Sequence, residues 1–201
     1  ERRGGDRGAR RRGTAFPARL ELYSVVDVLC SKGRSLDVGC EARLLESNER
    51  VRLDQEHAAA AAPMAELLDR VTQDGLESPK LFACTRAAFA CMGGLDACQV
   101  PSVCAAHLLK TLAFSGLRPS LDSCAACGGP VASADVAGDV YVSFREGGVV
   151  CAACRTQVDA TFVPASTVAW MRFLLGATFA EVVESGMGLD SAFSFLRFCQ
   201  E

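Results

Sequence analysis

The stretch SCAACG at residues 123–128 and its counterpart CAAC at residues 151–154 decide how the second half of this sequence folds. Each CxxC turn places two thiolates on one edge of a metal tetrahedron, and two turns complete a four-sulfur shell. Residues 140–144 alternate valine with polar or aromatic residues before Gly147-Gly148, which predicts a hairpin that brings the two pairs together. We therefore predict a structural Zn²⁺ site, one per chain, in a module over residues 121–158. Its ligands are Cys124, Cys127, Cys151 and Cys154.

Three other uses of the CxxC pairs stay open at the level of sequence: a redox pair, structural disulfides and free thiols. A redox pair at Cys124 and Cys127 requires a thioredoxin-like βαβ context, which the pattern lacks. Structural disulfides require an oxidising compartment, but the chain is neither short nor preceded by an apolar signal segment. We therefore expect a reducing cytoplasm. Cysteines in apolar, alanine-rich sequence are expected to serve as small hydrophobes, namely Cys84, Cys91, Cys98 and Cys104.

Charge is distributed unevenly along the 201 residues. The net charge is -3, yet the first 19 residues carry seven arginines against two acidic residues, a local charge of +5. Such asymmetry indicates that one end meets a polyanion, although a solvated tail is a common alternative. The candidate DNA contacts are Arg10, Arg11, Arg12, Arg19, Lys32 and Arg34.

Hydrophobic periodicity predicts strands first and helices afterwards. Residues 16–23 alternate as in a half-buried strand, and a second strand follows at 36–40 after a turn at 31–33. Helices are expected from residue 55, where Pro63 should kink or split the helix, and then at 79–93, 101–115, after Pro164 and at 189–200. No apolar run reaches the roughly 18–20 residues of a membrane span, so we expect no membrane association.

The sequence offers little for catalysis. The two histidines, His57 and His107, stand in no HExxH motif, and no GKS or GKT marks a phosphate-binding loop. Glu181 and Glu184 are read as a solvated helix face. We therefore expect a protein that is not an enzyme.

Several stretches together resemble one bacterial family of DNA repair proteins, RecO. GARRRG at 8–13, LELY at 20–23 and EARLLES at 41–47 resemble its N-terminal OB-fold and the chain leading from it. ELLDRVTQDG at 66–75 and SPKLF at 78–82 resemble its first helices. LLKTLAFSGLRPSLDSCAACG at 108–128 and VSFREGGVVCAAC at 142–154 resemble the helix that leads into its zinc module.

This resemblance implies an α+β protein. Residues 1–50 would be a basic, DNA-binding part of an OB-fold barrel whose first strands are absent, and residues 51–201 a helical domain that includes the zinc module. The implied function is that of a recombination mediator in the RecF pathway, cytoplasmic and associated with the nucleoid. It would bind single- and double-stranded DNA, anneal strands, and load RecA together with RecR and single-stranded-DNA-binding protein. A zinc-ribbon module that binds proteins but not DNA, and a thiol oxidoreductase, are the rival hypotheses.

Overall fold

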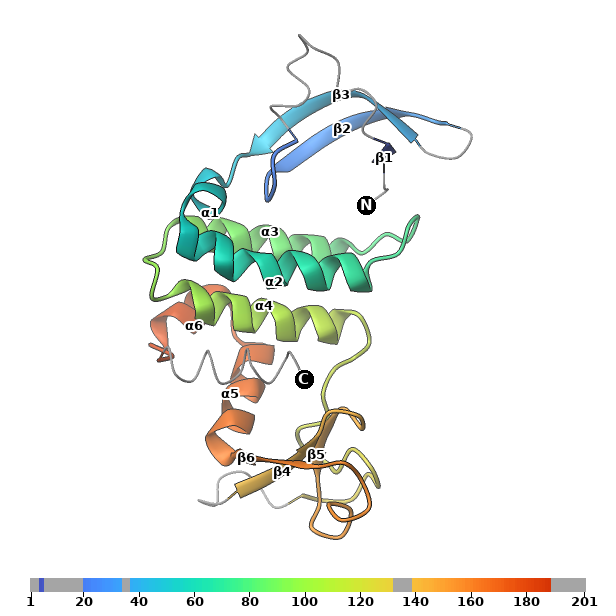
Figure 1. The fold of residues 1–201 in the computed structure, drawn as a ribbon, viewed down its shortest axis with the longest axis vertical. Coiled ribbons are helices and arrows are strands. Elements are labelled where there is room, and N and C mark those ends of the chain that lie inside the picture. Colours follow the sequence, from blue (N-terminus) through green and yellow to red (C-terminus); the bar gives the residue numbers. More distant parts are fainter. Residues whose placement is uncertain (1–3, 6–19, 34–36, 132–138, 189–201) are drawn as a thin grey trace. The chain divides into compact units, whose positions relative to one another are not determined.

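The computed structural model describes residues 4–5, 20–33, 37–131 and 139–188 (Figure 1). The chain separates into two compact units, Glu1–Val100 and Pro101–Glu201. The boundary between the units falls at the first residue of helix α4 (Val100–Phe114). The domain boundary that the sequence predicts near residue 50 stays a prediction.

The first unit begins with a small sheet of order β1-β3-β2. Its strands are β1 (Gly4–Gly5), β2 (Val25–Ser31) and β3 (Asp37–Glu46), and β2 runs antiparallel to β3. A register shift lies between Leu29 and Cys30, where β3 carries one extra residue. The strands that the structure describes here do not close into a barrel, so the OB-fold stays a prediction.

The two predicted strands differ from the observed ones. Residues 16–19 lie outside the described residues, and residues 20–23 are not extended as predicted. Tyr23 has a φ of 64°, in the left-handed region, which interrupts any strand before Val25. The second predicted strand is present and longer, since β3 extends to Glu46.

Three helices complete the first unit. They are α1 (Glu49–Leu53), α2 (Gln55–Val71) and α3 (Pro79–Gly93), and α1 packs against both others. Of the two effects predicted for Pro63, a split is wrong, because α2 continues through it as one helix, and a kink stays a prediction. Burial of Ala61 and Met64 on either side of Pro63 offsets the backbone hydrogen bond that proline removes.

His57 is a packing residue of this unit. Its ring is fully buried, with Nδ1 2.7 Å from Asp54 Oδ1 and Nε2 3.2 Å from the Leu95 carbonyl oxygen. Asp54 also caps α2 by accepting from the backbone N–H groups of Glu56 and His57. The hydrogen bond from His57 lowers the pKa of Asp54. This ring therefore joins the start of α2 to the chain that follows α3.

The second unit contains a three-stranded antiparallel sheet of order β5-β4-β6. Its strands are β4 (Asp139–Ser143), β5 (Gly148–Val150) and β6 (Thr161–Pro164), followed by α5 (Ala165–Gly176) and α6 (Phe179–Glu184). The predicted hairpin is confirmed as β4 and β5, whereas β6 was not predicted. The predicted helix at 189–200 lies outside the described residues.

One hydrophobic core holds the second unit together. It joins α4, the sheet, α5 and α6, through Ala105, Leu109, Leu121, Val142, Val149, Val163, Val168, Met171, Leu174 and Val182 among others. Leu121 belongs to this core and stands three residues before the first metal-site cysteine. Across the described ranges, no helix combines the length and apolar character needed to cross a membrane.

Candidate metal centre

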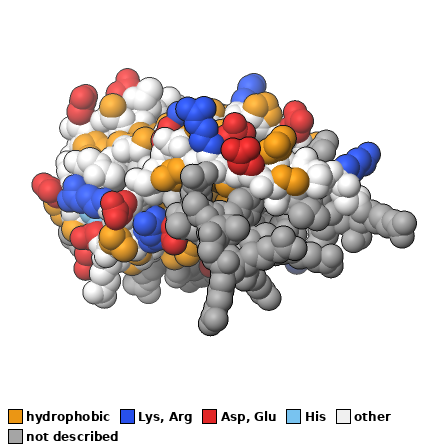
Figure 2. Space-filling model, turned by 90° about the horizontal axis from the view of Figure 1, so that it is seen from above, with side chains coloured by type: hydrophobic (Ala, Val, Ile, Leu, Met, Phe, Trp, Pro, Cys, Tyr) orange, Lys and Arg blue, Asp and Glu red, His pale blue; other side chains and the backbone are white. Residues whose placement is uncertain are grey.

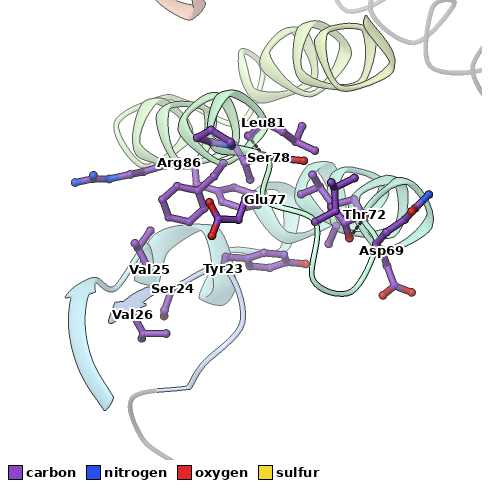
Figure 3. Close-up of a pocket in the computed structure, with 18 of the residues that line it drawn as sticks. Tyr23, Ser24, Val25, Val26, Asp69, Thr72, Glu77, Ser78, Leu81 and Arg86 are labelled. Carbon is purple, nitrogen blue, oxygen red and sulfur yellow. Dashed lines mark hydrogen bonds between the residues drawn. The ribbon is translucent and has the colours of Figure 1, made fainter. Parts of the chain in front are cut away.

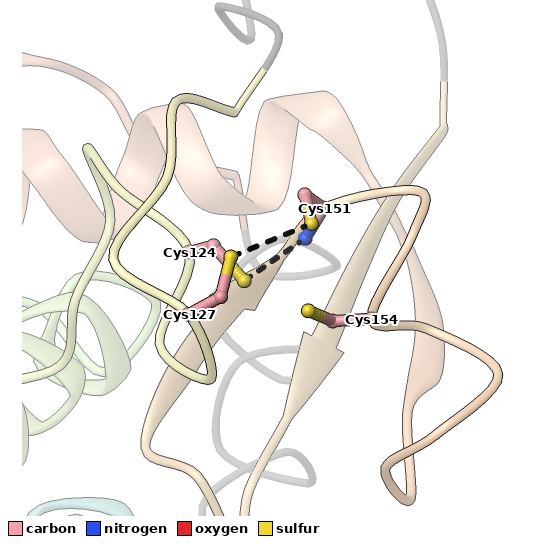
Figure 4. Close-up of side chains that lie close together, drawn as sticks. All are labelled: Cys124, Cys127, Cys151 and Cys154. Atoms are coloured by element: carbon pink, nitrogen blue, oxygen red, sulfur yellow. Dashed lines mark hydrogen bonds between the residues drawn. The ribbon is translucent and has the colours of Figure 1, made fainter.

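The four predicted cysteines meet in space (Figure 4). Their Sγ atoms all lie within 4.8 Å of one another, and the Sγ atoms of Cys127 and Cys151 are 3.9 Å apart. A disulfide requires about 2.05 Å. A tetrahedral metal with bonds of about 2.3 Å to sulfur gives sulfur–sulfur edges of about 3.8 Å. The observed separation therefore suits four thiolates around one ion and not a disulfide.

Backbone hydrogen bonds shape the first CxxC turn. The Gly128 N–H donates to the Cys124 carbonyl at 2.8 Å, and the Cys124 N–H donates to the Gly129 carbonyl at 2.8 Å. Gly128 has a φ of 72°, which favours glycine at this position. The turn thereby directs Cys124 and Cys127 to the same side.

The second turn is formed in a similar way and is joined to the first. The N–H groups of Cys154 and Arg155 both donate to the Cys151 carbonyl, at 3.1 and 3.0 Å. The Cys151 N–H donates to Cys124 Sγ at 3.3 Å. Such N–H···S bonds stabilise negative charge on a ligating sulfur and orient it.

The segment before the first CxxC turn pairs with the β4–β5 hairpin at Ser120, and β5 leads into the second turn. Ser120 donates its N–H to the Gly147 carbonyl and accepts from the Val149 N–H, both at 2.9 Å. The Ala125 N–H then donates to the Val149 carbonyl at 2.8 Å. A Cβ on Gly148 would lie 2.8 Å from Ser120 N and 2.9 Å from Ser120 C, so only glycine allows the two segments to approach this closely.

An arginine on α5 holds the start of the module. The Arg172 Nε donates to Asp122 Oδ1 at 2.9 Å, and its Nη2 donates to the Leu121 carbonyl. The Leu121 side chain is buried in the core beside α5. The metal site is thus built on a folded helical base, and Arg172 is a positioning residue that sequence reasoning missed. Its only sequence signal is that it is the one charged residue of this helix.

The electrostatics of the cluster favour a cation. The backbone N–H of Cys151 is the main cause that lowers the pKa of Cys124 to about 6. Hydrogen bonding to Cys151 and then to Cys127 raises the pKa of Cys154 to about 12. Four thiols this close therefore do not all ionise unaided, whereas a divalent ion would neutralise two of the four negative charges. The donor set, with sulfur at all four positions, suits Zn²⁺.

The remaining cysteines only partly follow the prediction. Cys104 is buried, as expected of a small hydrophobe, while Cys84 and Cys91 are half-buried. Burial raises the pKa of Cys91. Cys98 is exposed, so the expectation that it serves as a small hydrophobe is not met.

The predicted DNA contacts fall mainly outside the described residues. Arg10, Arg11, Arg12, Arg19 and Arg34 all lie there, and Lys32 is exposed directly after β2. Arg43 on β3 is also exposed, opposite Asp27. In the face that Figure 2 shows, basic and acidic side chains are interspersed over the described surface. The predicted set of DNA contacts therefore stays a prediction.

A four-cysteine cluster on a hairpin, with the geometry to hold a metal ion, defines a candidate metal module within a protein of mixed helices and strands. A family model described as "Recombination protein O C terminal" matches residues 52–186, which include the whole cluster. The chain belongs to this family, RecO, and the resemblance seen in the sequence is confirmed.

Named relatives agree with this assignment. A DNA repair protein RecO of Rubrobacter xylanophilus is 34% identical, over 92% of this chain and 73% of that protein. One of Desulfitobacterium hafniense is 33% identical over 75% of this chain and 53% of that protein. One of Frankia casuarinae is 33% identical over 84% and 67%. The chain thus spans between about half and three quarters of the length of these relatives.

Proposed function

We propose that this chain acts in DNA repair as a non-enzymatic, DNA-binding recombination mediator. It would anneal complementary strands and, with RecR and single-stranded-DNA-binding protein, load RecA in the RecF pathway. The observation that carries the proposal is the match to the RecO family over residues 52–186, with relatives named as DNA repair proteins.

The role of the cysteine cluster in this proposal is structural. We propose that Cys124, Cys127, Cys151 and Cys154 hold one Zn²⁺ and leave no open position for a substrate. The free energy of metal binding would then become free energy of folding for the hairpin module. The hydrogen bonds of Ser120 with Gly147 and Val149, and of Ala125 with Val149, support this role. They join the segment that carries the first CxxC pair to the strand that leads into the second.

The role in DNA binding is assigned to the basic N-terminal segment. Annealing requires two polyanionic strands to approach, and arginines lower their repulsion while releasing counterions. Arg10, Arg11 and Arg12 are the proposed centre of this contact, with Arg19, Lys32 and Arg34 extending it. The local charge of +5 over residues 1–19 supports the assignment.

Fluorescence anisotropy with labelled single-stranded DNA, repeated over a salt series, tests this proposal. Affinity should fall as salt rises. In a variant with Arg10, Arg11 and Arg12 replaced by alanine, the plot of log affinity against log salt should become shallower by about 2. A control variant replaces three exposed cations outside the N-terminal segment, Arg70, Lys80 and Arg145, with alanine. It loses the same charge and should keep most of the salt dependence of the parent chain.

The outcomes separate the rivals. Binding unchanged in the arginine variant would refute the role of the N-terminal segment. Stoichiometric zinc without any salt-dependent DNA binding would favour the zinc-ribbon protein-interaction module. Disulfide turnover without stoichiometric metal would favour the oxidoreductase.

A further inference from the structure

A groove of about 790 Å³ lies within the first unit (Figure 3). Its walls are the chain leading into β2 with the first residues of that strand, the last turns of α2, the loop at residues 72–78, and α3 as far as Phe89. No part of the metal module contributes to it. The groove is therefore a feature separate from the site described above.

The floor and the rim of the groove are apolar. Leu81 and Phe89 are buried at the floor, being 6% and 7% exposed. Leu22, Leu76 and Phe82 stand at the rim with 69%, 61% and 50% of their surface exposed. Three large apolar side chains exposed around one hollow indicate a surface that binds a partner.

A strained residue forms part of the wall. Tyr23 has a φ of 64°, and the Asn48 side-chain amide donates to its carbonyl at 2.7 Å. Its ring lies 5.2 Å from the Phe89 ring, between centroids. Left-handed backbone at a bulky residue is unfavourable and persists where the surroundings hold it, often at binding sites. Here it places an aromatic ring on the groove wall.

The charge at the rim is acidic. Asp69, Asp74 and Glu77 line the groove and are exposed, and Glu77 lies above the Tyr23 ring in Figure 3. Among the described residues that line the groove, Arg86 is the one cation, and it forms an ion pair with Glu46. The rim therefore repels a nucleic acid or an acidic peptide and attracts a cationic one.

We propose that this groove is a docking site for a protein segment that carries large apolar side chains flanked by lysine or arginine. The apolar side chains would enter between Phe82 and Tyr23, and a flanking cation would meet Glu77. This proposal does not depend on the DNA-binding function, because none of the described residues that line the groove is a proposed DNA contact.

Anisotropy with a short fluorescein-labelled peptide, a Phe-Leu pair with two lysines on each side, tests the proposal on the full chain. The peptide should bind, and its affinity should drop about tenfold in E77K because a rim charge reverses sign. E146K, which makes the same change on the β4–β5 turn, should bind as the parent chain does.

Two further measurements separate apolar from ionic contributions. F82S removes a half-exposed side chain and should weaken binding several-fold while the circular dichroism spectrum is unchanged. A second peptide with glutamates in place of the lysines should bind at least tenfold more weakly. The proposal is overturned if the cationic peptide does not bind, if both peptides bind equally, or if E77K and E146K behave alike.

Discussion

Replacing Gly148 with alanine should break the metal module without touching any ligand. The new Cβ would lie 2.8 Å from Ser120 N and 2.9 Å from Ser120 C, where ordinary carbon contacts need about 3.5–4.0 Å. Both atoms are backbone, so no side chain can rotate away to relieve the overlap. Ser120 and Gly148 must therefore separate.

The expected loss can be worked out from the contacts. Separation breaks the two hydrogen bonds that Ser120 makes with Gly147 and Val149, worth about 1 kcal/mol each. Overpacking adds about 1–3 kcal/mol. A total of about 3–5 kcal/mol corresponds to a loss of about two to four orders of magnitude in zinc affinity if all of it falls on the bound state.

Zinc affinity measured by competition with a colorimetric chelator, together with thermal unfolding, checks this result. G176A is a matched control, because a Cβ there meets nothing within 4 Å. G147A meets no atom either but has a φ of 74°, so it isolates backbone strain of about 1–2 kcal/mol. The reasoning is refuted if G148A binds zinc and unfolds as G176A does.

Three further predictions concern single side chains. Burial lowers the pKa of His107 to about 4, so folding favours its neutral form and stability falls as pH drops below 6.5. Between pH 7.5 and 5, the free energy of unfolding in urea should therefore fall by about 2 kcal/mol more in the parent chain than in H107Q. Equal losses in the two chains would contradict this. C151S should remove stoichiometric zinc measured by elemental analysis, whereas C98S at an exposed cysteine should retain it; zinc retained in C151S would remove that residue from the ligand set. T178A removes the capping box with Glu181 and should cost about 1 kcal/mol in thermal unfolding, and an unchanged midpoint would show that the cap contributes nothing.

The metal centre could be predicted from sequence because its signal is local. The spacing within each CxxC pair and the Gly147-Gly148 turn specify two turns and a hairpin, and no distant contact is needed to recognise them. The contact of Arg172 with Asp122, by contrast, depends on how α5 packs, which periodicity does not reveal. The same holds for β6, a short strand whose pairing with β4 is tertiary.

Errors in the first unit arose where tertiary packing overrides local preference. The apolar alternation from Phe16 continues through Tyr23, but a hydrogen bond from Asn48 and contact with Phe89 hold Tyr23 in a left-handed conformation. Pro63 signals a helix break locally, yet α2 continues through it where Ala61 and Met64 are buried. The groove was missed for the same reason, since its walls come from segments far apart in the sequence.

Strand annealing tests the proposed function most directly. Two complementary oligonucleotides carrying a fluorescence donor and acceptor should anneal faster when this chain is added at low salt. The acceleration should disappear at high salt and in the variant with Arg10, Arg11 and Arg12 replaced by alanine, while bound zinc stays at one per chain. Annealing that is no faster with the zinc-loaded chain than without it would contradict the account.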